Sequence, residues 1–119
     1  MTCVFVYGTL KKGGRNHRYL AGQQFLGETR TSPGHTLYSL GDYPGMVRSN
    51  NPGHDVVGEV WQVDAPCLAR LDQLEGVNEG LYERVAIALA PPFAGQTVET
   101  YFYLRSLAGR PALGSVWRE

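Results

Sequence analysis

The pattern of hydrophobic and polar positions predicts a chain built mainly of short strands. Runs of β-branched and aromatic residues, bounded by glycine, proline and asparagine, are typical of strands. Such runs occupy positions 3–7, 25–31, 35–40, 46–48, 56–63, 82–89 and 97–104. Turn-forming residues separate several of them, at positions 41–45, 49–54 and 90–92. We therefore expect six or more short strands joined by turns.

Two segments have a helical pattern instead. Segment 66–75 is preceded by Asp64, a good N-cap residue, and is followed by Gly76, which favours the end of a helix. Segment 16–21 predicts a second, shorter helix with Asn16 at its N-cap. So few helices among so many strands do not fit a regular alternation of strand and helix.

Together these elements predict an α+β fold: a small mixed β-barrel-like sheet with one or two short helices. We expect one domain over residues 1–119, because the chain is long enough for one core and too short for two. Positions from about 105 to 119 contain proline and glycine and predict a weakly specified C-terminal tail. The longer helix would cover one face of the sheet or close one end of it.

Glu75 interrupts the apolar side of the longer helix. With about 100° between successive residues, an apolar arc is formed by Cys67, Leu68, Leu71 and Leu74. Glu75 projects between Leu68 and Leu71, inside this arc. A charge on a core-facing side costs free energy unless it has a partner or a task. Desolvation and the negative end of the helix dipole both raise the pKa of such a carboxyl, which suits a general acid and base.

The alternative interpretation of Glu75 is structural. Helices often end in a polar residue that turns back into solvent or pairs with a nearby cation, and Arg84 is such a cation. The pattern of the helix alone leaves both interpretations open.

The segment after the first strand, positions 7–10, is a candidate ligand-binding loop. Backbone N–H groups that leave a buried strand lack obligatory partners and can converge on an anion. Gly8 would allow a ligand close to the main chain, and Thr9 would add a hydroxyl donor. The alternative is a tight turn in which Gly8 adopts a positive φ. A nucleotide-binding P-loop is excluded, because Gly14 and Arg15 stand where that motif requires Lys and Ser or Thr.

Composition and charge exclude several classes of protein. The 11 basic and 11 acidic residues give a formal net charge of zero without a basic stripe, so we expect no nucleic-acid partner. No apolar run approaches the length of a membrane span, and the first residues do not resemble a signal peptide. Cys3 and Cys67 fit no metal or redox spacing and predict free thiols in a reducing cytoplasm. The three histidines lack metal-ligand spacing, so we expect no metal site.

Six short motifs follow one another along the chain. They are Val-Phe-Val-Tyr-Gly-Thr-Leu-Lys at 4–11, Asn-His at 16–17, Tyr-Pro at 43–44 with Val47, Gly-Glu-Val at 58–60, Leu-Asp-Gln-Leu-Glu-Gly at 71–76 and Leu-Tyr-Glu-Arg at 81–84. In this order they resemble the gamma-glutamylcyclotransferase family, most closely its small gamma-glutamylamine cyclotransferase branch. The resemblance extends to about Tyr103.

The resemblance implies a fold, a site and a reaction. Members of the family share a small barrel-like α+β fold with a cavity at one end, and they need no metal or organic cofactor. The substrate-binding loop would be formed by Tyr7, Gly8, Thr9 and Leu10, whose main-chain amides hold the gamma-glutamyl group. Glu75 would be the general acid and base that converts a gamma-glutamyl amine or amino acid to 5-oxoproline and releases the free amine.

Two tyrosines are further candidates for substrate binding. Tyr82 matches a tyrosine that the family keeps near its site, and Tyr103 on the last predicted strand would line the cavity. Core packing is the alternative for both side chains.

Two other functions stay open beside the cyclotransferase. The chain would be a non-catalytic module that binds a small metabolite in the same cavity, or an enzyme that transfers the gamma-glutamyl group to another amine. The partner expected in each case is a small molecule, a gamma-glutamyl substrate for the two enzymes. The pattern indicates neither a membrane partner nor a particular oligomeric state.

Overall fold

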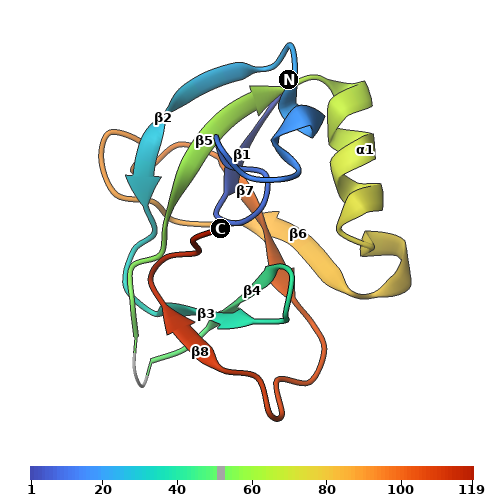
Figure 1. The fold of residues 1–119 in the computed structure, drawn as a ribbon. Helices are drawn as coiled ribbons and strands as arrows, with labels where there is room; N and C mark the ends of the chain where they lie inside the picture. The colour runs from blue at the N-terminus through green and yellow to red at the C-terminus, as the bar shows by residue number, and fades with distance from the viewer. Residues whose placement is uncertain (51–52) are drawn as a thin grey trace.

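Among the residues that the structure describes, two β-sheets and one α-helix make up a mixed α+β fold, as the sequence predicts (Figure 1). The computed structural model describes residues 1–50 and 53–119. The larger sheet has the strand order β2-β5-β1-β7-β6, formed by β1 (Thr2–Val6), β2 (Gln24–Arg30), β5 (Val57–Val63), β6 (Tyr82–Ala86) and β7 (Glu99–Tyr103). The smaller sheet has the order β4-β3-β8, formed by β3 (His35–Ser39), β4 (Pro44–Arg48) and β8 (Ala112–Gly114). The helices of the described residues are α1 (Ala65–Leu74) and two 3₁₀ helices, η1 (His17–Leu20) and η2 (Val77–Glu79).

Strand β1 is the centre of the larger sheet. It runs antiparallel to β5, with Val4 opposite Trp61, and parallel to β7, with Val4 opposite Glu99. Side chains of successive residues in a strand point to opposite faces. Val4 and Val6 accordingly pack with residues of α1, whereas Phe5 packs with residues of the smaller sheet. The end of β1 therefore brings the loop that follows it to the middle of the sheet, next to α1.

Helix α1 begins and ends within one residue of the predicted segment 66–75. The Asp64 carboxylate accepts a hydrogen bond from the Cys67 backbone N–H at 2.8 Å, which caps the first turn. Gly76 adopts a φ of +64°, a conformation that favours glycine just after a helix. Cys67 and Leu71 are fully buried against the larger sheet. Glu75 is the residue between the helix and this glycine, so its side chain lies at the C-terminal end of α1.

Two strand boundaries differ from the pattern. Strand β4 begins inside the predicted turn at 41–45, because its first residue pairs with Ser39 across the β3–β4 hairpin. Strand β6 is shorter than the predicted strand at 82–89. Its pairing with β7 stops at Ala86, and Leu89 instead forms an isolated bridge with Thr31, the residue after β2.

The C-terminal segment and the first short helix also differ in detail. Strand β8 lies within 105–119, where the sequence indicates only a weakly specified tail, and it pairs antiparallel with β3. The helix predicted at 16–21 is the 3₁₀ helix η1, and Asn16 lies at its N-cap without making a side-chain capping bond. Of the turn predicted at 49–54, positions 51 and 52 lie outside the described residues.

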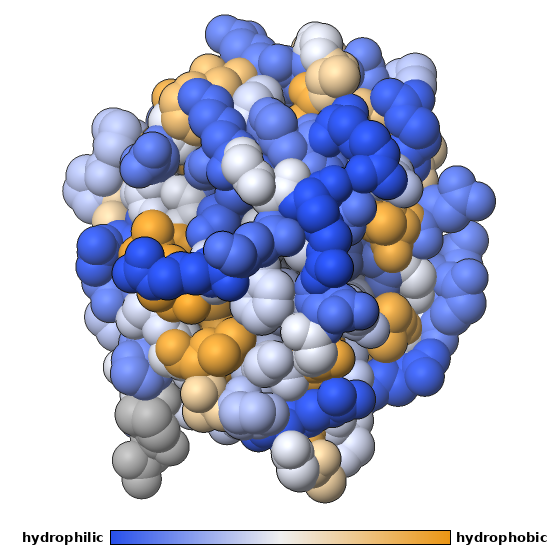
Figure 2. Space-filling model, viewed as in Figure 1, coloured by the Kyte–Doolittle hydropathy of each residue, from blue (hydrophilic) through white to orange (hydrophobic). Residues whose placement is uncertain are grey.

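Most of the buried apolar side chains form two clusters inside the fold. One cluster lies between α1 and the larger sheet, and the other lies between the two sheets. On the face shown in Figure 2, hydrophobic residues appear as separate patches between polar ones. Within the residues that the structure describes, no helix is both long enough and apolar enough to cross a membrane.

Candidate active site

A cavity of about 340 Å³ opens at the C-terminal end of α1. Small-molecule sites typically have volumes of roughly 300–1,000 Å³. Its buried and partly buried lining comes from α1, β1, β6, β7 and the loops that follow α1 and β1. These residues include Phe5, Val6, Tyr7, Gly8, Thr9, Leu10, Leu74, Glu75, Leu81, Tyr82 and Tyr101. The structure therefore brings the predicted loop at 7–10, Tyr82 and Glu75 together in one hollow.

The loop after β1 lines this cavity and carries free backbone N–H groups. Within residues 1–50 and 53–119, the N–H groups of Gly8, Thr9 and Leu10 donate to no other residue. Gly8 does not have the positive φ that the tight-turn interpretation requires. Glycine is needed there for a different reason, because a Cβ on Gly8 would lie 2.8 Å from Cγ of Pro44. Free N–H groups from successive residues can bind an anionic group or a developing oxyanion.

Asn16, which lines the opening of the cavity, and His17, which does not line it, hold this loop in shape. Asn16 Nδ2 donates to Thr9 Oγ1 at 3.0 Å, and the Asn16 backbone N–H donates to the Thr9 carbonyl oxygen at 3.0 Å. His17 Nδ1 lies 2.9 Å from the carbonyl oxygen of Leu10. Because Thr9 Oγ1 is an acceptor in its bond with Asn16, the hydroxyl hydrogen of Thr9 stays available to a ligand.

Glu59 anchors the far end of the same loop. Its carboxylate is buried on β5 and accepts the Lys12 backbone N–H at 3.0 and 3.2 Å. The indole Nε1–H of Trp61 also donates to Glu59, at 3.1 Å. The Lys12 ammonium lies 3.4 Å from the centre of the Phe25 ring. A buried carboxylate with these donors is satisfied, so Glu59 positions the loop from outside the cavity.

The Glu75 carboxyl has no partner in the described part of the chain: no hydrogen bond or ion pair engages it. Arg84, the cation of the structural alternative, pairs with Asp72 and Glu99 instead. Burial, and after it the negative charge of Asp72, raise the pKa of Glu75 from 4.5 to about 7. The predicted rise in pKa is confirmed, with burial as its largest cause, and the charge of Asp72 adds to it. Near neutral pH such a carboxyl can both accept and donate a proton.

Three tyrosines surround Glu75 within the cavity. The Tyr7 hydroxyl donates to the Tyr101 carbonyl oxygen at 2.6 Å, and the Tyr82 hydroxyl donates to the Pro44 carbonyl oxygen at 2.7 Å. Burial is the main cause of a raised pKa at Tyr7, Tyr82 and Tyr101, and the charge of Glu75 contributes at each. These hydroxyls therefore stay protonated, and their hydrogen bonds fix the walls of the cavity.

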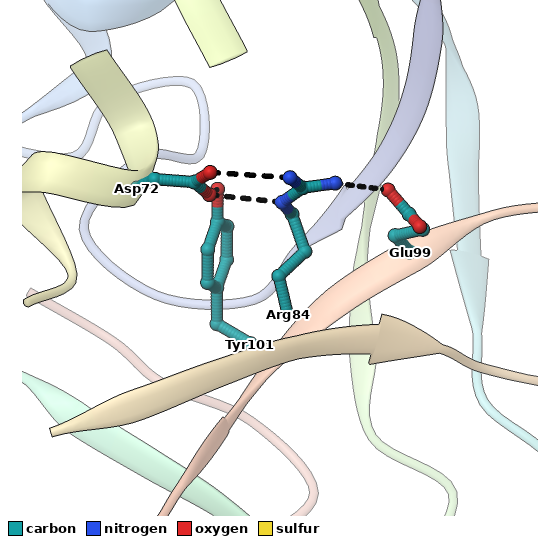
Figure 3. A network of polar contacts seen from close by, with 4 residues as sticks. All are labelled: Asp72, Arg84, Glu99 and Tyr101. Atoms are coloured by element: carbon teal, nitrogen blue, oxygen red, sulfur yellow. Dashed lines mark hydrogen bonds and ion pairs between the residues drawn. The ribbon is translucent and has the colours of Figure 1, made fainter. Parts of the chain in front are cut away.

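A network of polar contacts lies beside the cavity, between α1 and the edge of the larger sheet (Figure 3). Arg84 on β6 donates to both carboxylate oxygens of Asp72 on α1, at 2.9 and 3.1 Å. Arg84 also pairs with Glu99 on β7. The Tyr101 hydroxyl donates to Asp72 at 2.8 Å. One guanidinium thus serves two carboxylates, and the cluster keeps one negative charge.

Of the two tyrosines that share one face of β7, Tyr101 lines the cavity and Tyr103 does not. The Tyr103 ring lies 5.3 Å from the ring of Tyr82, and its Cβ would lie 2.9 Å from a Cβ added to Gly45. Residues at a spacing of two share a face of a strand, so the alternating pattern could have indicated Tyr101 equally well. Only the position along the strand distinguishes the two residues.

The opening of the cavity is formed by residues that the sequence pattern does not assign to a binding site. They are Arg15, Asn16, Asp42 and Tyr43. Arg15, Asp42 and Tyr43 are exposed. Asn16 and Tyr43 belong to the motifs at 16–17 and 43–44, and Arg15 and Asp42 are their neighbours in the chain, so these motifs are the one signal that could have found the opening.

The described residues contain no group of three or more histidine, cysteine, aspartate and glutamate side chains that could hold a metal ion. Cys3 and Cys67 are free thiols.

Comparisons with known proteins identify the family of this chain. The family model for "Gamma-glutamyl cyclotransferase, AIG2-like" matches residues 4–119. A Vibrio cholerae protein that is provisionally described as a gamma-glutamylcyclotransferase is 51% identical over 74 residues, and a gamma-glutamylaminecyclotransferase of Rattus norvegicus is 35% identical over 94 residues. The alignments cover 62% and 73% of this chain. They span 62% of each relative, which is less than two thirds of its length.

A solved structure also has the same fold. The solution structure of the Escherichia coli protein YtfP is 34% identical, with a TM-score of 0.72. The structural match covers 96% of this chain and 93% of the YtfP chain. Together with the match over residues 4–119, these similarities show that the chain belongs to the gamma-glutamyl cyclotransferase, AIG2-like, family.

Proposed function

We propose that this protein is a cyclotransferase that converts a gamma-glutamyl amine or amino acid to 5-oxoproline and the free amine. The observation that carries this proposal is the unpaired Glu75 carboxyl, with a pKa of about 7, in one cavity with the free N–H groups of the loop after β1. The two parts match the two needs of the reaction, a proton carrier and a donor set for negative charge.

Glu75 is the proton carrier of the proposed reaction. The α-ammonium group of the substrate is not nucleophilic until it loses a proton, and the Glu75 carboxylate accepts it. The amine nitrogen then attacks the γ-carbonyl carbon and forms a tetrahedral intermediate. Protonated Glu75 donates to the leaving nitrogen as its bond to the γ-carbon breaks. The ring nitrogen then passes its second proton to the Glu75 carboxylate, which returns it to the released amine, so the α-ammonium loses two protons, the released amine gains two and no net acid or base is consumed.

The loop after β1 supplies the hydrogen-bond donors of the proposed reaction. In the intermediate the γ-carbonyl oxygen becomes negatively charged, and the substrate also carries an α-carboxylate. The N–H groups of Gly8, Thr9 and Leu10 and the Thr9 hydroxyl are donors for these oxygens. Ring closure is intramolecular, so the site needs mainly to hold the substrate in its folded, reactive conformation. The rigid walls formed by Tyr7 and Tyr82 support that role.

The proton transfers described here use groups of this chain alone, and the proposed mechanism calls on no metal or organic cofactor. The free thiols of Cys3 and Cys67 are consistent with a reducing compartment, and we place the reaction in the cytoplasm.

The test is product analysis by mass spectrometry with a panel of gamma-glutamyl amines and amino acids. We expect 5-oxoproline and the free amine from the protein, and a loss of about 10³-fold in turnover for Glu75→Gln. Glu79→Gln is the matched control, because Glu79 is exposed just beyond the same helix end, and its turnover should be unchanged. Circular dichroism of each variant verifies the fold.

Other outcomes identify the rival functions. Ligand-induced thermal stabilisation without any product would indicate a binding module. A new gamma-glutamyl amide without 5-oxoproline would indicate transfer to another amine. Full turnover by Glu75→Gln would remove Glu75 from the mechanism.

A further inference from the structure

The opening of the cavity differs in charge from its interior, and this difference bears on which amine the substrate releases. Arg15 is the only lysine or arginine among the described residues that line the cavity. It lies at the opening, with 48% of its side chain exposed. Asp42 lines the same opening and is also exposed. This inference rests on the proposed cyclotransferase reaction and concerns the part of the substrate that leaves.

The backbone of Arg15 and the Nε atom of its guanidinium have partners that hold them in place. Its backbone N–H donates to the Glu119 carboxylate at 3.0 and 3.3 Å, and its Nε lies 3.7 Å from the same group. The Arg15 carbonyl oxygen accepts a bond from Arg18 Nη1 at 2.8 Å. Within the described residues, the two terminal Nη groups of Arg15 have no partner. Arginine binds a carboxylate most effectively through a free pair of N–H groups. The two Nη groups of Arg15 can therefore bind a carboxylate.

The size and polarity of the cavity determine which part of a substrate meets Arg15. The γ-carbonyl has to reach Glu75 and the N–H groups of the loop after β1, so the glutamyl part occupies the interior. At about 340 Å³ the cavity is near the lower limit for small-molecule sites. The amine part, attached to the γ-carbonyl, therefore extends toward the opening and its exposed residues.

We propose that Arg15 binds a carboxylate on the released amine, and so makes gamma-glutamyl amino acids better substrates than gamma-glutamyl amines that lack this group. Glu119 is a positioning residue in this arrangement, because it orients Arg15 without facing the cavity. Asp42 acts in the opposite sense and disfavours a carboxylate at the opening. Both charges are exposed, so their effects decrease with ionic strength.

A matched pair of substrates tests this proposal. Gamma-glutamyl-L-alanine and gamma-glutamylethylamine differ only by the carboxylate on the released amine. For Arg15→Gln we expect kcat/KM for the alanine compound to fall about tenfold, and that for the ethylamine compound to change less than about twofold. Asp42→Asn should raise kcat/KM for the alanine compound alone. Arg70→Gln, which removes an exposed positive charge from α1 outside the cavity, should change neither.

Binding measured without turnover separates this proposal from the proposed function. Calorimetric titration of both compounds into Glu75→Gln, with and without Arg15→Gln, gives the ratio of the two dissociation constants. Retention of an Arg15-dependent preference in Glu75→Gln, together with no 5-oxoproline from either compound with the wild-type protein, would support the carboxylate site and reject the cyclotransferase. Equal losses of affinity for both compounds in Arg15→Gln would overturn the inference, because they would indicate that Arg15 binds the glutamyl α-carboxylate. Unchanged affinity for both compounds in Arg15→Gln would also overturn the inference.

Discussion

Two carboxylates at the C-terminal end of α1 differ in their polar partners. Asp72 and Glu75 are three residues apart, so they lie about one helical turn from each other. Asp72 accepts hydrogen bonds from Arg84 and Tyr101, whereas Glu75 has no hydrogen bond or ion pair in the described part of the chain. Both carboxylates are at least partly buried, but only Asp72 has hydrogen-bond and ion-pair partners among the described residues.

The difference follows from what each side chain faces. Asp72 faces the edge of the larger sheet, where β6 supplies Arg84 and β7 supplies Tyr101 (Figure 3). Glu75 faces the cavity and the loop after β1, which offers N–H groups but no side-chain cation close to the carboxyl. A paired carboxylate holds elements together, whereas an unpaired one in a hollow keeps a proton that it can transfer. In the proposed mechanism, the carboxylate that stabilises the fold, Asp72, and the one that transfers the proton, Glu75, are thus one turn of helix apart.

The largest expected effect is on turnover, and it should distinguish the two residues sharply. Glu75→Gln should lower the rate of 5-oxoproline formation by about 10³-fold, because the proton carrier is lost. Asp72→Asn should lower it by about tenfold or less, because Asp72 acts through its neighbours. Steady-state rates of the two variants on one substrate measure the contrast. Equal losses would mean that the two carboxylates work as a unit.

The second effect is on stability as a function of pH. Since the pKa of Glu75 is raised from 4.5 to about 7 in the folded protein, its contribution to stability is fully present below pH 4.5 and is lost as the pH rises to about 7. Glu75→Gln has no such loss. Relative to the wild-type protein, the variant should therefore gain about 3 kcal/mol between pH 4 and pH 8. Urea unfolding at several pH values measures this gain, and a constant difference between the two proteins would contradict a raised pKa.

The smallest effect concerns the link between the two carboxylates. Asp72→Asn should cost about 1–3 kcal/mol of stability, because Arg84 and Tyr101 lose an acceptor. It should also move the acid limb of the pH–rate profile to lower pH, because the charge of Asp72 raises the pKa of Glu75. Glu99→Gln is the matched control: it removes the other partner of Arg84 but no charge that acts on Glu75. An unmoved acid limb in Asp72→Asn would show that burial alone sets the pKa.

Local patterns predict the elements well because they depend on neighbouring residues. The helix α1 was predictable from its cap at Asp64, its apolar arc and Gly76, and the position of Glu75 inside that arc follows from helical geometry. Strand β8 was not predictable, since three residues carry too little pattern and the strand depends on pairing with β3.

The candidate site was predictable only in part. The loop at 7–10 and Glu75 each have a local signal, and their meeting in one cavity was an expectation drawn from the family resemblance. The choice of Tyr101 over Tyr103, and the pairing of Arg84 with Asp72, depend on how α1 lies against β6 and β7. Such contacts join residues far apart in the chain, so no local pattern contains them. Gly8 shows the same point, because its necessity comes from Pro44 and not from its own φ.

The central claim is that Glu75 is an unpaired carboxyl whose proton is exchanged near neutral pH. Carbon-13 NMR titration of the glutamate side-chain carboxyl groups, assigned by comparison with Glu75→Gln, tests it most directly. The account predicts one carboxyl resonance with a midpoint at about pH 7 that is absent from the variant. A Glu75 resonance that titrates at its ordinary value of 4.5 would contradict the account.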